Sequence, residues 1–429
     1  MILDTARDLL GSGPLCDPCL GRPFADRSFG LTNEARGNAL RTALALEDDE
    51  PYESPDTEAC WVCEGVCADH EEWAERAVAA FEDVDFSTYQ VGTRVPPLLE
   101  ENDRLLREEA GMDPDAGEPL KSAFNREVGK RFGRLTDTEV DFERPDVLAL
   151  CHLERDEVEV QVNPAFVYGR YEKLERDIPQ TEWPCRECGG SGKQLGDGGE
   201  EPCEHCGGSG YLYDTSVEEE ITPHVKEAMD GVEALFHGAG REDVDARMLG
   251  TGRPFVVEIK NPTRRSPDAA ALQREINETS DLVRVSGLAL ATHEMVERVK
   301  ELDASKTYRA DVEFDGDASA DDLEAACEEL RGKTVEQRTP NRVDHRRSDL
   351  VRERTVYSIE ADREDARHAT IEIHGAGGLY IKELISGDEG RTEPSLAGLL
   401  GVGAEVTALD VTAVEGEEEP FADEDYLRE

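Results

Sequence analysis

A short acidic cluster between two glycine turns is the stretch of this chain best suited to chemistry. Residues 236–261 read FHGAGREDVDARMLGTGRPFVVEIKN, with glycine turns at 238–240 and 250–252. Glycine lets a backbone turn tightly and approach a ligand closely. The cluster at 241–245 places carboxylates beside an arginine, and the apolar run 254–259 is typical of a buried strand. We therefore interpret the cluster as a candidate site rather than as a solvated face.

Two positively charged stretches stand out from an otherwise acidic chain. Residues 241–265 hold six Lys or Arg against four acids, and residues 331–354 hold eight against four together with His345, whereas the whole chain has a net charge of −51. Arginine makes bidentate contacts with phosphate. Binding to an RNA backbone would therefore explain both stretches together. Internal salt bridges within the fold are the alternative interpretation.

The excess of acidic residues in the rest of the chain is informative about solubility and the salt conditions of the cell rather than about the fold. The chain has 98 Asp and Glu against 47 Lys and Arg in 429 residues. Such dispersed acidity resembles proteins of halophilic cells, where molar salt shortens the Debye length to about 3 Å. An acidic disordered chain is the alternative, but a hydrophobic content of 38% argues against it. Because we find neither a signal peptide nor an apolar run of about 18 residues, we expect a soluble, cytoplasmic protein without membrane association.

The eleven cysteines of the chain are mostly arranged in pairs. There are four Cys-x-x-Cys pairs, Cys16/Cys19, Cys60/Cys63, Cys185/Cys188 and Cys203/Cys206, with Cys67, Cys151 and Cys327 outside them. Two such pairs can supply four thiolates to one tetrahedral zinc, and disulfides are rare in the cytosol. We expect one structural zinc at the first two pairs, with the role of Cys67 left open, and a second zinc at the other two.

The last two pairs belong to a repeated unit, CRECGGSG followed by CEHCGGSG. The repeat resembles half of the zinc-binding cysteine-rich module of DnaJ-type chaperones. Glycine after each pair permits a turn that directs amide N–H groups at the sulfurs. The J-domain sequence His-Pro-Asp is not found in the chain, so the unit is interpreted as a reusable zinc clip. The acidic loop at 193–201 leaves its metal state open.

Hydrophobic periodicity predicts an α/β (α+β) protein with several segments. A zinc module at 1–70 precedes a small α/β domain at 71–180, with helices at 70–84 and 118–135 and strands at 86–95, 147–153 and 157–162. The cysteine repeat is an insert at 181–214. A larger α/β domain covers 215–414, with Ser319 as the N-cap of a helix at 320–330, and 415–429 is expected to be an acidic disordered tail.

Several polar and aromatic residues allow two interpretations. Tyr168, Arg170, Tyr171, Lys173 and Arg176 are either an RNA-contacting surface or a solvated strand edge. Taken alone, Tyr308 is interpreted as an aromatic residue of the core. Tyr380 and Lys382, just after a glycine turn, are interpreted as residues with a packing and capping role. The two Gly-x-Gly sequences lack the third glycine of a dinucleotide-binding turn, and neither a Walker lysine pattern nor Gly-x-Ser-x-Gly is found.

Segments along nearly the whole chain, in collinear order, resemble the archaeal-type tRNA pseudouridine synthases that act on the T-loop. Gly240-Arg-Glu-Asp243-Val-Asp-Ala is similar to their segment Gly-Arg-Thr-Asp-Ala-Gly-Val, Lys306-Thr-Tyr308-Arg-Ala to their Lys-x-Tyr segment, and Gly378-Leu-Tyr380-Ile-Lys382-Glu-Leu384 to their Gly-Thr-Tyr-Ile-Arg-x-Leu segment. IPQTEWPCREC at 178–188 and ISGDEGRTEPS at 385–395 are also similar. The resemblance implies a THUMP-like RNA-binding domain before a catalytic domain with a mixed, mainly antiparallel sheet.

The resemblance further implies conversion of uridine to pseudouridine at tRNA positions 54 and/or 55, by a monomer that binds the T-arm and uses no organic or nucleotide cofactor. Breaking the glycosidic bond, rotating the base and rejoining it through carbon requires a base outside its stack. Asp243 would be the nucleophile or charge stabiliser, kept ionised by Lys382 together with Arg241. Tyr308 would stack on the base, and Tyr380 would lie in the substrate-binding segment. Asp245 is the rival for the catalytic role.

Two alternatives from other classes stand beside this interpretation. A non-catalytic, zinc-containing RNA-binding or chaperone-like protein would use the cysteines and the basic stretches, but it leaves Asp243 between its glycines unexplained. A different THUMP-bearing tRNA enzyme, a methyltransferase or thiolase, would need an S-adenosylmethionine-binding or P-loop fingerprint, and the chain shows neither.

Overall fold

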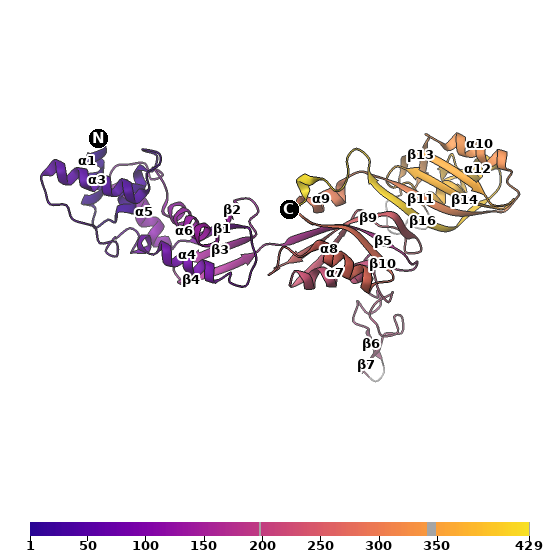
Figure 1. The fold of residues 1–429 in the computed structure, drawn as a ribbon, viewed down its shortest axis with the longest axis horizontal. Helices are drawn as coiled ribbons and strands as arrows, with labels where there is room; N and C mark the ends of the chain where they lie inside the picture. Colours follow the sequence, from indigo (N-terminus) through magenta and orange to yellow (C-terminus); the bar gives the residue numbers. More distant parts are fainter. Residues whose placement is uncertain (197–198, 341–348, 429) are drawn as a thin grey trace. The chain divides into compact units, whose positions relative to one another are not determined.

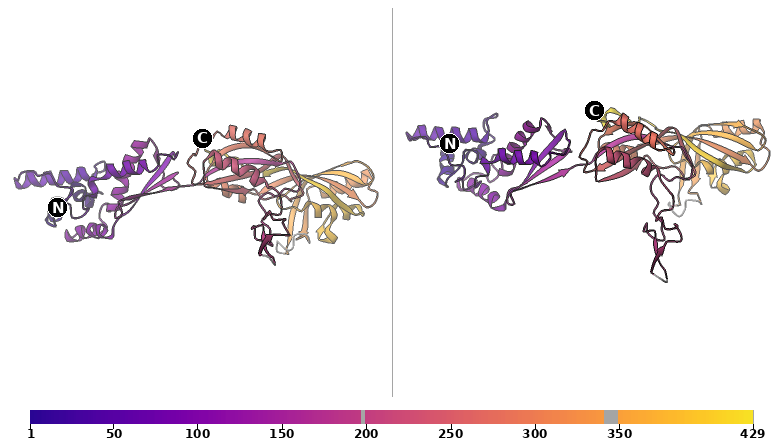
Figure 2. Two further views of the ribbon diagram at one scale, coloured as in Figure 1. Left: turned by 90° about the horizontal axis from the view of Figure 1, so that it is seen from below. Right: turned by 60° about the horizontal axis from the view of Figure 1, so that its bottom comes forward.

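The computed structural model describes residues 1–196, 199–340 and 349–428, which form two compact units (Figures 1 and 2). Unit 1 comprises Met1–Pro164 and Asn261–Arg265, and unit 2 comprises Ala165–Lys260 and the chain from Ser266 onward. Each unit is built around its own hydrophobic clusters. Within the described ranges, every helix is too short or too polar to cross a membrane.

The first half of unit 1 is a group of short helices around the N-terminal cysteines. It contains α1 (Ile2–Gly11), α2 (Asp17–Gly21), η1 (Arg22–Phe24), α3 (Asn33–Asp48), η2 (Val66–Ala68) and α5 (Pro97–Glu109). Helix α3 begins where the Thr32 hydroxyl accepts a hydrogen bond from the Ala35 amide. Helices α2 and α3 meet at glycines, because a Cβ on Gly21 or Gly37 would collide with the backbone of the other helix.

The second half of unit 1 is a small sheet with two helices. The sheet has the order β2 (Glu139–Val140), β1 (Thr88–Arg94), β3 (Val147–His152), β4 (Glu157–Val162), and β4 alone runs antiparallel to its neighbour. Helices α4 (His70–Ala79) and α6 (Leu120–Thr136) cover it through buried aromatics such as Phe124 and Phe132. The segment Asn261–Arg265 is attached to this unit by a buried ion pair between Arg265 and Asp146 at 3.0 Å.

Unit 2 is organised on a ten-stranded mixed sheet. Its order is β10 (Val283–Ala291), β5 (Ala165–Lys173), β9 (Arg247–Lys260), β16 (Ala404–Gly416), β11 (Ala304–Phe314), β14 (His368–Gly375), β13 (Val351–Arg363), β12 (Thr334–Arg338), β15 (Thr392–Glu393), with β8 (Glu233–Gly238) also paired to β9. Among the described strands of this sheet, β9 and β16 form the one parallel pair. The predicted mixed, mainly antiparallel sheet is therefore confirmed.

Helices cover this sheet in two groups (Figure 1). Helices α7 (Val217–Ala228), α8 (Ala269–Thr279) and α9 (Glu294–Glu301) pack on the β8–β9–β10 part, and α10 (Ala320–Leu330), α11 (Ile381–Ser386) and α12 (Leu396–Leu400) pack near β13 and β16. A short turn, η4 (Asp388–Gly390), follows α11. Ser319 caps α10 as predicted, since its hydroxyl accepts from the Asp322 amide. The β9–β16–β11 region between the two groups is where the site lies.

Strand β5 differs from its expected place at the end of the preceding small domain. It lies inside the large sheet between β10 and β9, where Tyr168, Tyr171 and Lys173 are buried. The interpretation of these residues as an RNA surface or a solvated edge was wrong for these three. The polar atoms of Tyr171 and Lys173 are accommodated in the interior because the loop around Glu242, distant in the sequence, supplies partners for both.

The acidic C-terminal end also differs from the expected disordered tail. Phe421 is 1% exposed in the core of unit 2, and the Arg298 guanidinium donates a hydrogen bond to its carbonyl at 3.0 Å. A 3-10 turn, η5 (Glu424–Tyr426), follows, with Arg298 lying over the Tyr426 ring. One aromatic anchor and one arginine therefore order a segment whose composition alone is that of a solvated tail.

Candidate active site and metal centres

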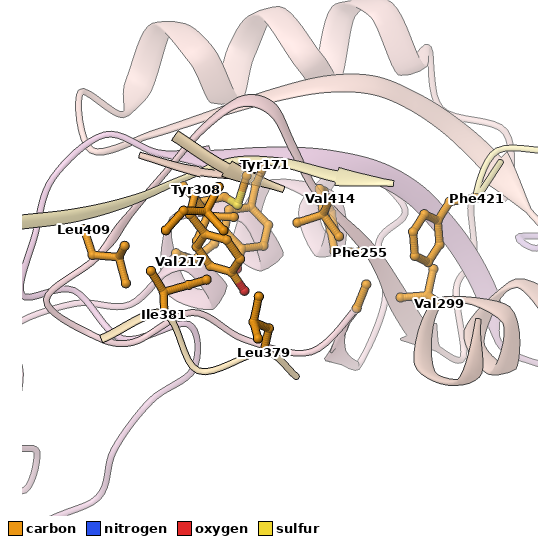
Figure 3. Packing of buried hydrophobic residues seen from close by; sticks show 14 of the residues in the cluster. Tyr171, Val217, Phe255, Val299, Tyr308, Leu379, Ile381, Leu409, Val414 and Phe421 are labelled. Carbon is orange, nitrogen blue, oxygen red and sulfur yellow. The ribbon is translucent and has the colours of Figure 1, made fainter. Parts of the chain in front are cut away.

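One cavity in unit 2 gathers the residues that the sequence singled out for catalysis and substrate binding. It has a volume of about 640 Å³. Its lining includes Arg241, Asp243, Tyr308, Tyr380 and Lys382. These residues come from the β8–β9 loop, from β11 and from the turn into α11. They meet because β9 and β11 both pair with β16, and α11 contacts β16. Figure 3 shows the Tyr308 ring among Leu379, Ile381 and Leu409, which line the same cavity.

Lys382 lies between two carboxylates. Its Nζ is 2.8 Å from Oδ2 of Asp245 and 3.9 Å from Oδ2 of Asp243. The Asp243 side chain is 42% exposed and that of Asp245 is 61% exposed. The lysine therefore pairs more closely with the outer acid than with Asp243, the predicted partner.

Tyr308 presents a neutral ring to the cavity. Its residue is 9% exposed, and burial raises the pKa of its phenol to about 12, with the charge of Arg253 opposing that rise. An aromatic ring on a strand has few rotamers, so it is suited to act as a stacking surface. Tyr308 thus belongs to the core and to the cavity wall at once, so the two interpretations of its sequence do not exclude each other.

The turn that carries Tyr380 and Lys382 is held by one buried glutamine that sequence reasoning missed. The Gln337 amide on β12 donates to the Tyr380 carbonyl at 2.9 Å, and its oxygen accepts from the Tyr380 amide at 2.9 Å. Gln337 is fully buried. Its position within the basic stretch 331–354 offered no signal, because the stretch drew attention to its charges.

A buried group of charged side chains around Glu242 supports the loop at 241–245 from the interior of the unit. The Glu242 side chain is 1% exposed, and its carboxylate lies 2.8 Å from Nε of Arg253 and 3.9 Å from Nζ of Lys173. The Tyr171 hydroxyl donates to it at 2.9 Å. The sequence signal for this group was the basic and aromatic alternation of β5, which we had interpreted as external.

The same buried cations hold the loop backbone on both sides of Asp243. Lys173 Nζ donates to the carbonyls of Asp243 at 3.3 Å and Val244 at 3.0 Å, and Arg253 donates to the carbonyl of Ala239 at 2.8 Å. Gln180 donates to the carbonyl of Gly240 at 2.9 Å. These interior donors hold the main-chain oxygens of the loop, so the backbone that carries Asp243 has a defined position in the cavity wall.

A second ionic group holds the loop end next to β16. Asp410 on β16 pairs with Arg247 and with Arg176, each at 2.7 Å, and Arg176 also donates to the Asp245 carbonyl at 2.9 Å. Burial alone would raise the pKa of Asp410, but the hydrogen bond from Arg247 and the charge of Arg176 lower it. Arg176 therefore has internal partners that hold the end of this loop.

The basic stretch 331–354 is partly used in internal pairs. Arg331, Lys333 and Arg338 pair with Glu328, Glu329 and Asp349. Three of the eight Lys or Arg of the predicted basic stretch, Arg342, Arg346 and Arg347, lie outside the described residues together with His345. For the paired residues, the salt-bridge alternative is the observed one.

The N-terminal cysteines form a cluster that can hold a metal ion, with one member different from expectation. The thiols of Cys16, Cys19, Cys63 and Cys67 all lie within 4.8 Å of one another. A zinc–sulfur bond of about 2.3 Å implies sulfurs about 3.8 Å apart in a tetrahedron, and the observed separations include 3.7 Å and 4.0 Å. Cys67 thus stands in the set where Cys60 was predicted, although Cys60 is buried beside it.

A buried arginine accompanies this first cluster. Arg22 is fully buried, donates to the Cys19 sulfur at 3.1 Å and pairs with Asp103 on α5. A guanidinium beside the sulfurs offsets the negative charge of a four-thiolate site. The donor set therefore fits a tetrahedral, thiol-binding ion such as zinc.

The repeated unit forms the second cluster, with all four predicted members. The thiols of Cys185, Cys188, Cys203 and Cys206 lie within 4.8 Å of one another, with separations of 3.9 Å and 3.8 Å. The amides of Gly192 and Gly210 donate to the sulfurs of Cys188 and Cys206 at 3.3 Å and 3.2 Å, so the predicted glycine turns are present. The hairpin β6 (Lys193–Gly196) and β7 (Gly199–Pro202) extends from this cluster.

Comparisons with known proteins agree with the division of the chain into the two units described above. The family model described as "Pus10, C-terminal" matches residues 166–415, and the archaeal Pus10 THUMP domain model matches residues 73–152. The tRNA pseudouridine synthase Pus10 of Halorubrum lacusprofundi is 68% identical over 429 residues, 100% of each chain. Those of Methanothrix thermoacetophila and Methanopyrus kandleri are 44% and 40% identical, covering 97% and 96% of this chain and 95% and 98% of their own.

These matches run through both units and decide against a chaperone-like or otherwise non-catalytic protein. They also decide against a methyltransferase or thiolase, since the matched C-terminal region contains the cavity with Asp243. The strong acidity fits the halophilic relative. The chain belongs to the archaeal Pus10 family of tRNA pseudouridine synthases.

Proposed function

We propose that this isomerase acts on the T-arm of tRNA, at uridine 54, uridine 55 or both, with Asp243 as the catalytic carboxylate. One observation carries the proposal: Asp243, Tyr308 and Lys382, from three distant segments, line one cavity of about 640 Å³. A flipped uridine would stack on Tyr308, with Asp243 facing its sugar or base as nucleophile or charge stabiliser. Lys382 and Arg241 would keep Asp243 ionised, and Tyr380 would contact the substrate.

The assignment to the T-loop is tested by a carbodiimide-based map of pseudouridine in tRNA transcripts incubated with the enzyme at molar KCl. Transcripts with uridine 54, uridine 55 or both replaced by cytidine serve as matched substrates. Product at these positions, lost with the matching replacement, is the expected result. Product elsewhere in the tRNA would overturn the T-loop assignment while leaving the family intact.

In this proposal the enzyme works as a cytoplasmic monomer without an organic or nucleotide cofactor. Unit 1, which contains the THUMP-matching region 73–152, positions the tRNA, and unit 2 performs the reaction. The sequence resemblance to T-loop enzymes and the presence of an RNA-binding type of domain support this division of labour.

Replacing Tyr308 tests the stacking role. Tyr308→Ala should lower kcat/KM by about 10- to 100-fold, because base–aromatic stacking is worth roughly 1–3 kcal/mol per base. Tyr308→Phe should retain most activity. Since burial raises the pKa of Tyr308 to about 12, wild type and Tyr308→Phe should also share one pH profile up to about pH 10. A basic limb that disappears in the phenylalanine variant would instead give the phenol a proton-transfer role.

We propose that both cysteine clusters hold structural zinc, with Cys16, Cys19, Cys63 and Cys67 as one ligand set and Cys185, Cys188, Cys203 and Cys206 as the other. Metal analysis should find two zinc per chain in the purified protein. Cys63→Ser and Cys203→Ser should each remove one, and Cys63→Ser should also unfold the N-terminal helices, because their core includes the ligands. Cys60→Ser should keep both ions, with the buried Cys327→Ser as control. Loss of zinc in Cys60→Ser would restore the originally predicted ligand set.

A further inference from the structure

A second, smaller cavity adjoins the first and lies at the base of the cysteine repeat. It has a volume of about 380 Å³. Its lining consists of Thr181, Glu182, Trp183, Pro184, Arg186, Leu212 and Arg241. Thr181, Trp183 and Arg241 also line the active-site cavity. The two spaces are therefore neighbours that share a wall formed by these three residues.

Trp183, in this shared wall, is held by residues that directly follow the cysteine repeat. The Trp183 carbonyl accepts from the Leu212 amide at 3.0 Å, and Pro184 forms a bridge with Tyr211. The Trp183 ring meets the Tyr213 ring edge-on, with centroids 5.5 Å apart and planes at 79°. Cys185, two residues after Trp183, is a member of the second cluster. The second cysteine cluster therefore holds together the two segments at its base, 183–185 and 210–212, and so fixes the backbone that carries Trp183.

The chemistry of the lining suits a nucleotide. Trp183, Pro184 and Leu212 are apolar, and Arg186 and Arg241 are exposed cations in a chain with a net charge of −51. Aromatic rings and guanidinium planes stack on bases of any sequence, and arginine binds phosphate. Glu182 is the acid of the lining, and a carboxylate there can accept a hydrogen bond from a base amino group but repels phosphate. The arginine side is therefore the phosphate side.

We propose that this side cavity binds a nucleotide next to the target uridine in the RNA, with its base stacked on Trp183 and its phosphate held by Arg186 and Arg241. The proposal rests on the assignment of the main cavity to the flipped uridine. The enzyme then binds two nucleotides that have left the base stack of the RNA. The uridine that it isomerises occupies the main cavity, and the neighbouring nucleotide occupies the side cavity. The neighbour is recognised by stacking rather than by its base identity.

The test is a cycle between protein and RNA changes in single-turnover reactions with the full-length enzyme. Pseudouridine is first mapped, and transcripts are then made with an abasic ribose on the 5′ or the 3′ side of the mapped uridine. One of these should react about 10- to 100-fold more slowly with wild type. Trp183→Ala should cause a similar loss on intact tRNA and no further loss on that abasic transcript. Trp183→Phe should recover most of the rate, and Arg186→Ala should raise KM and weaken its salt dependence.

Controls distinguish a loss of nucleotide binding in the side cavity from misfolding of the cysteine repeat and from a wrongly assigned target uridine. Leu195→Ala, at a residue 90% exposed in the β6–β7 hairpin, should react like wild type. Zinc content and melting temperature of Trp183→Ala report on the fold of the clip. If neither abasic transcript slows the wild type, or if the protein and RNA losses multiply, the proposal is overturned. The abasic ribose is placed beside whichever uridine is mapped. A target outside the T-loop would therefore refute the T-loop assignment, and the nucleotide site in the side cavity would still be tested by its own result.

Discussion

Replacing Asp243 with asparagine should abolish pseudouridine formation, lowering kcat by on the order of 10⁴-fold or more, while tRNA affinity stays within a few-fold of wild type. The amide keeps the size of the side chain and removes the charge and the nucleophilic oxygen. The backbone on both sides of Asp243 is held by Lys173 and Arg253, so the loop should remain in place. The measurement combines a pseudouridine map with a filter-binding titration of the same tRNA.

Asp245→Asn is the matched control, because Asp245 lies two residues away and is the closer partner of Lys382, at 2.8 Å. We expect a loss of about tenfold or less, from a less well-anchored lysine. Should Asp245→Asn be the inactive variant and Asp243→Asn the active one, the catalytic role would pass to Asp245. Activity in both variants would remove the carboxylates of this loop from the mechanism altogether.

Glu242→Gln should produce the second largest effect, on stability and on turnover together. The substitution leaves the guanidinium of Arg253, 1% exposed, without its nearest anion, and breaking such a buried pair costs about 3–5 kcal/mol. Because Arg253 and Lys173 also hold the loop carbonyls, their displacement should move Asp243. A shift of about 1 Å lowers the chemical step by roughly 100-fold, so kcat should fall while KM changes little. Urea denaturation and single-turnover kinetics measure the two effects.

Glu419→Gln is the control for removing one carboxylate of an ion pair in the same unit. Its side chain is 51% exposed where it pairs with Arg298, so the free energy of unfolding should change by about 1 kcal/mol or less, with unchanged kcat. If Glu242→Gln lost stability but turned over at the wild-type rate under folding conditions, Glu242 would support the fold without positioning Asp243. A rise in KM alone would likewise contradict the positioning role.

Much of the candidate site was predictable from local sequence. Asp243, Tyr308, Tyr380 and Lys382 were named from short segments, and all four line one cavity. The four members of the second cysteine cluster were predicted together, because two similar glycine-flanked pairs lie close along the chain and each makes its own glycine turn. Ser319 was recognised as a helix N-cap for the same reason, since its acceptor and the Asp322 amide are only three residues apart.

What sequence reasoning missed depends on partners that are distant in the chain. Glu242 becomes interior because β5 and β9 bring Tyr171 and Arg253 beneath it. Cys67 joins the first cluster with Cys16, Cys19 and Cys63, where Cys60 was predicted, and sequence spacing alone does not distinguish the two.

The sequence by itself determined the cysteine spacing and the candidate residues, because these depend on residue type and on position along the chain, and its resemblance to a known family implied the reaction class. Only the tertiary structure decided which charges are buried and paired, that Lys382 lies nearer to Asp245 than to Asp243, and that Phe421 orders the acidic end. The physical reason is that burial and ion pairing depend on the three-dimensional neighbourhood of a side chain. Composition and periodicity describe only its neighbours along the chain.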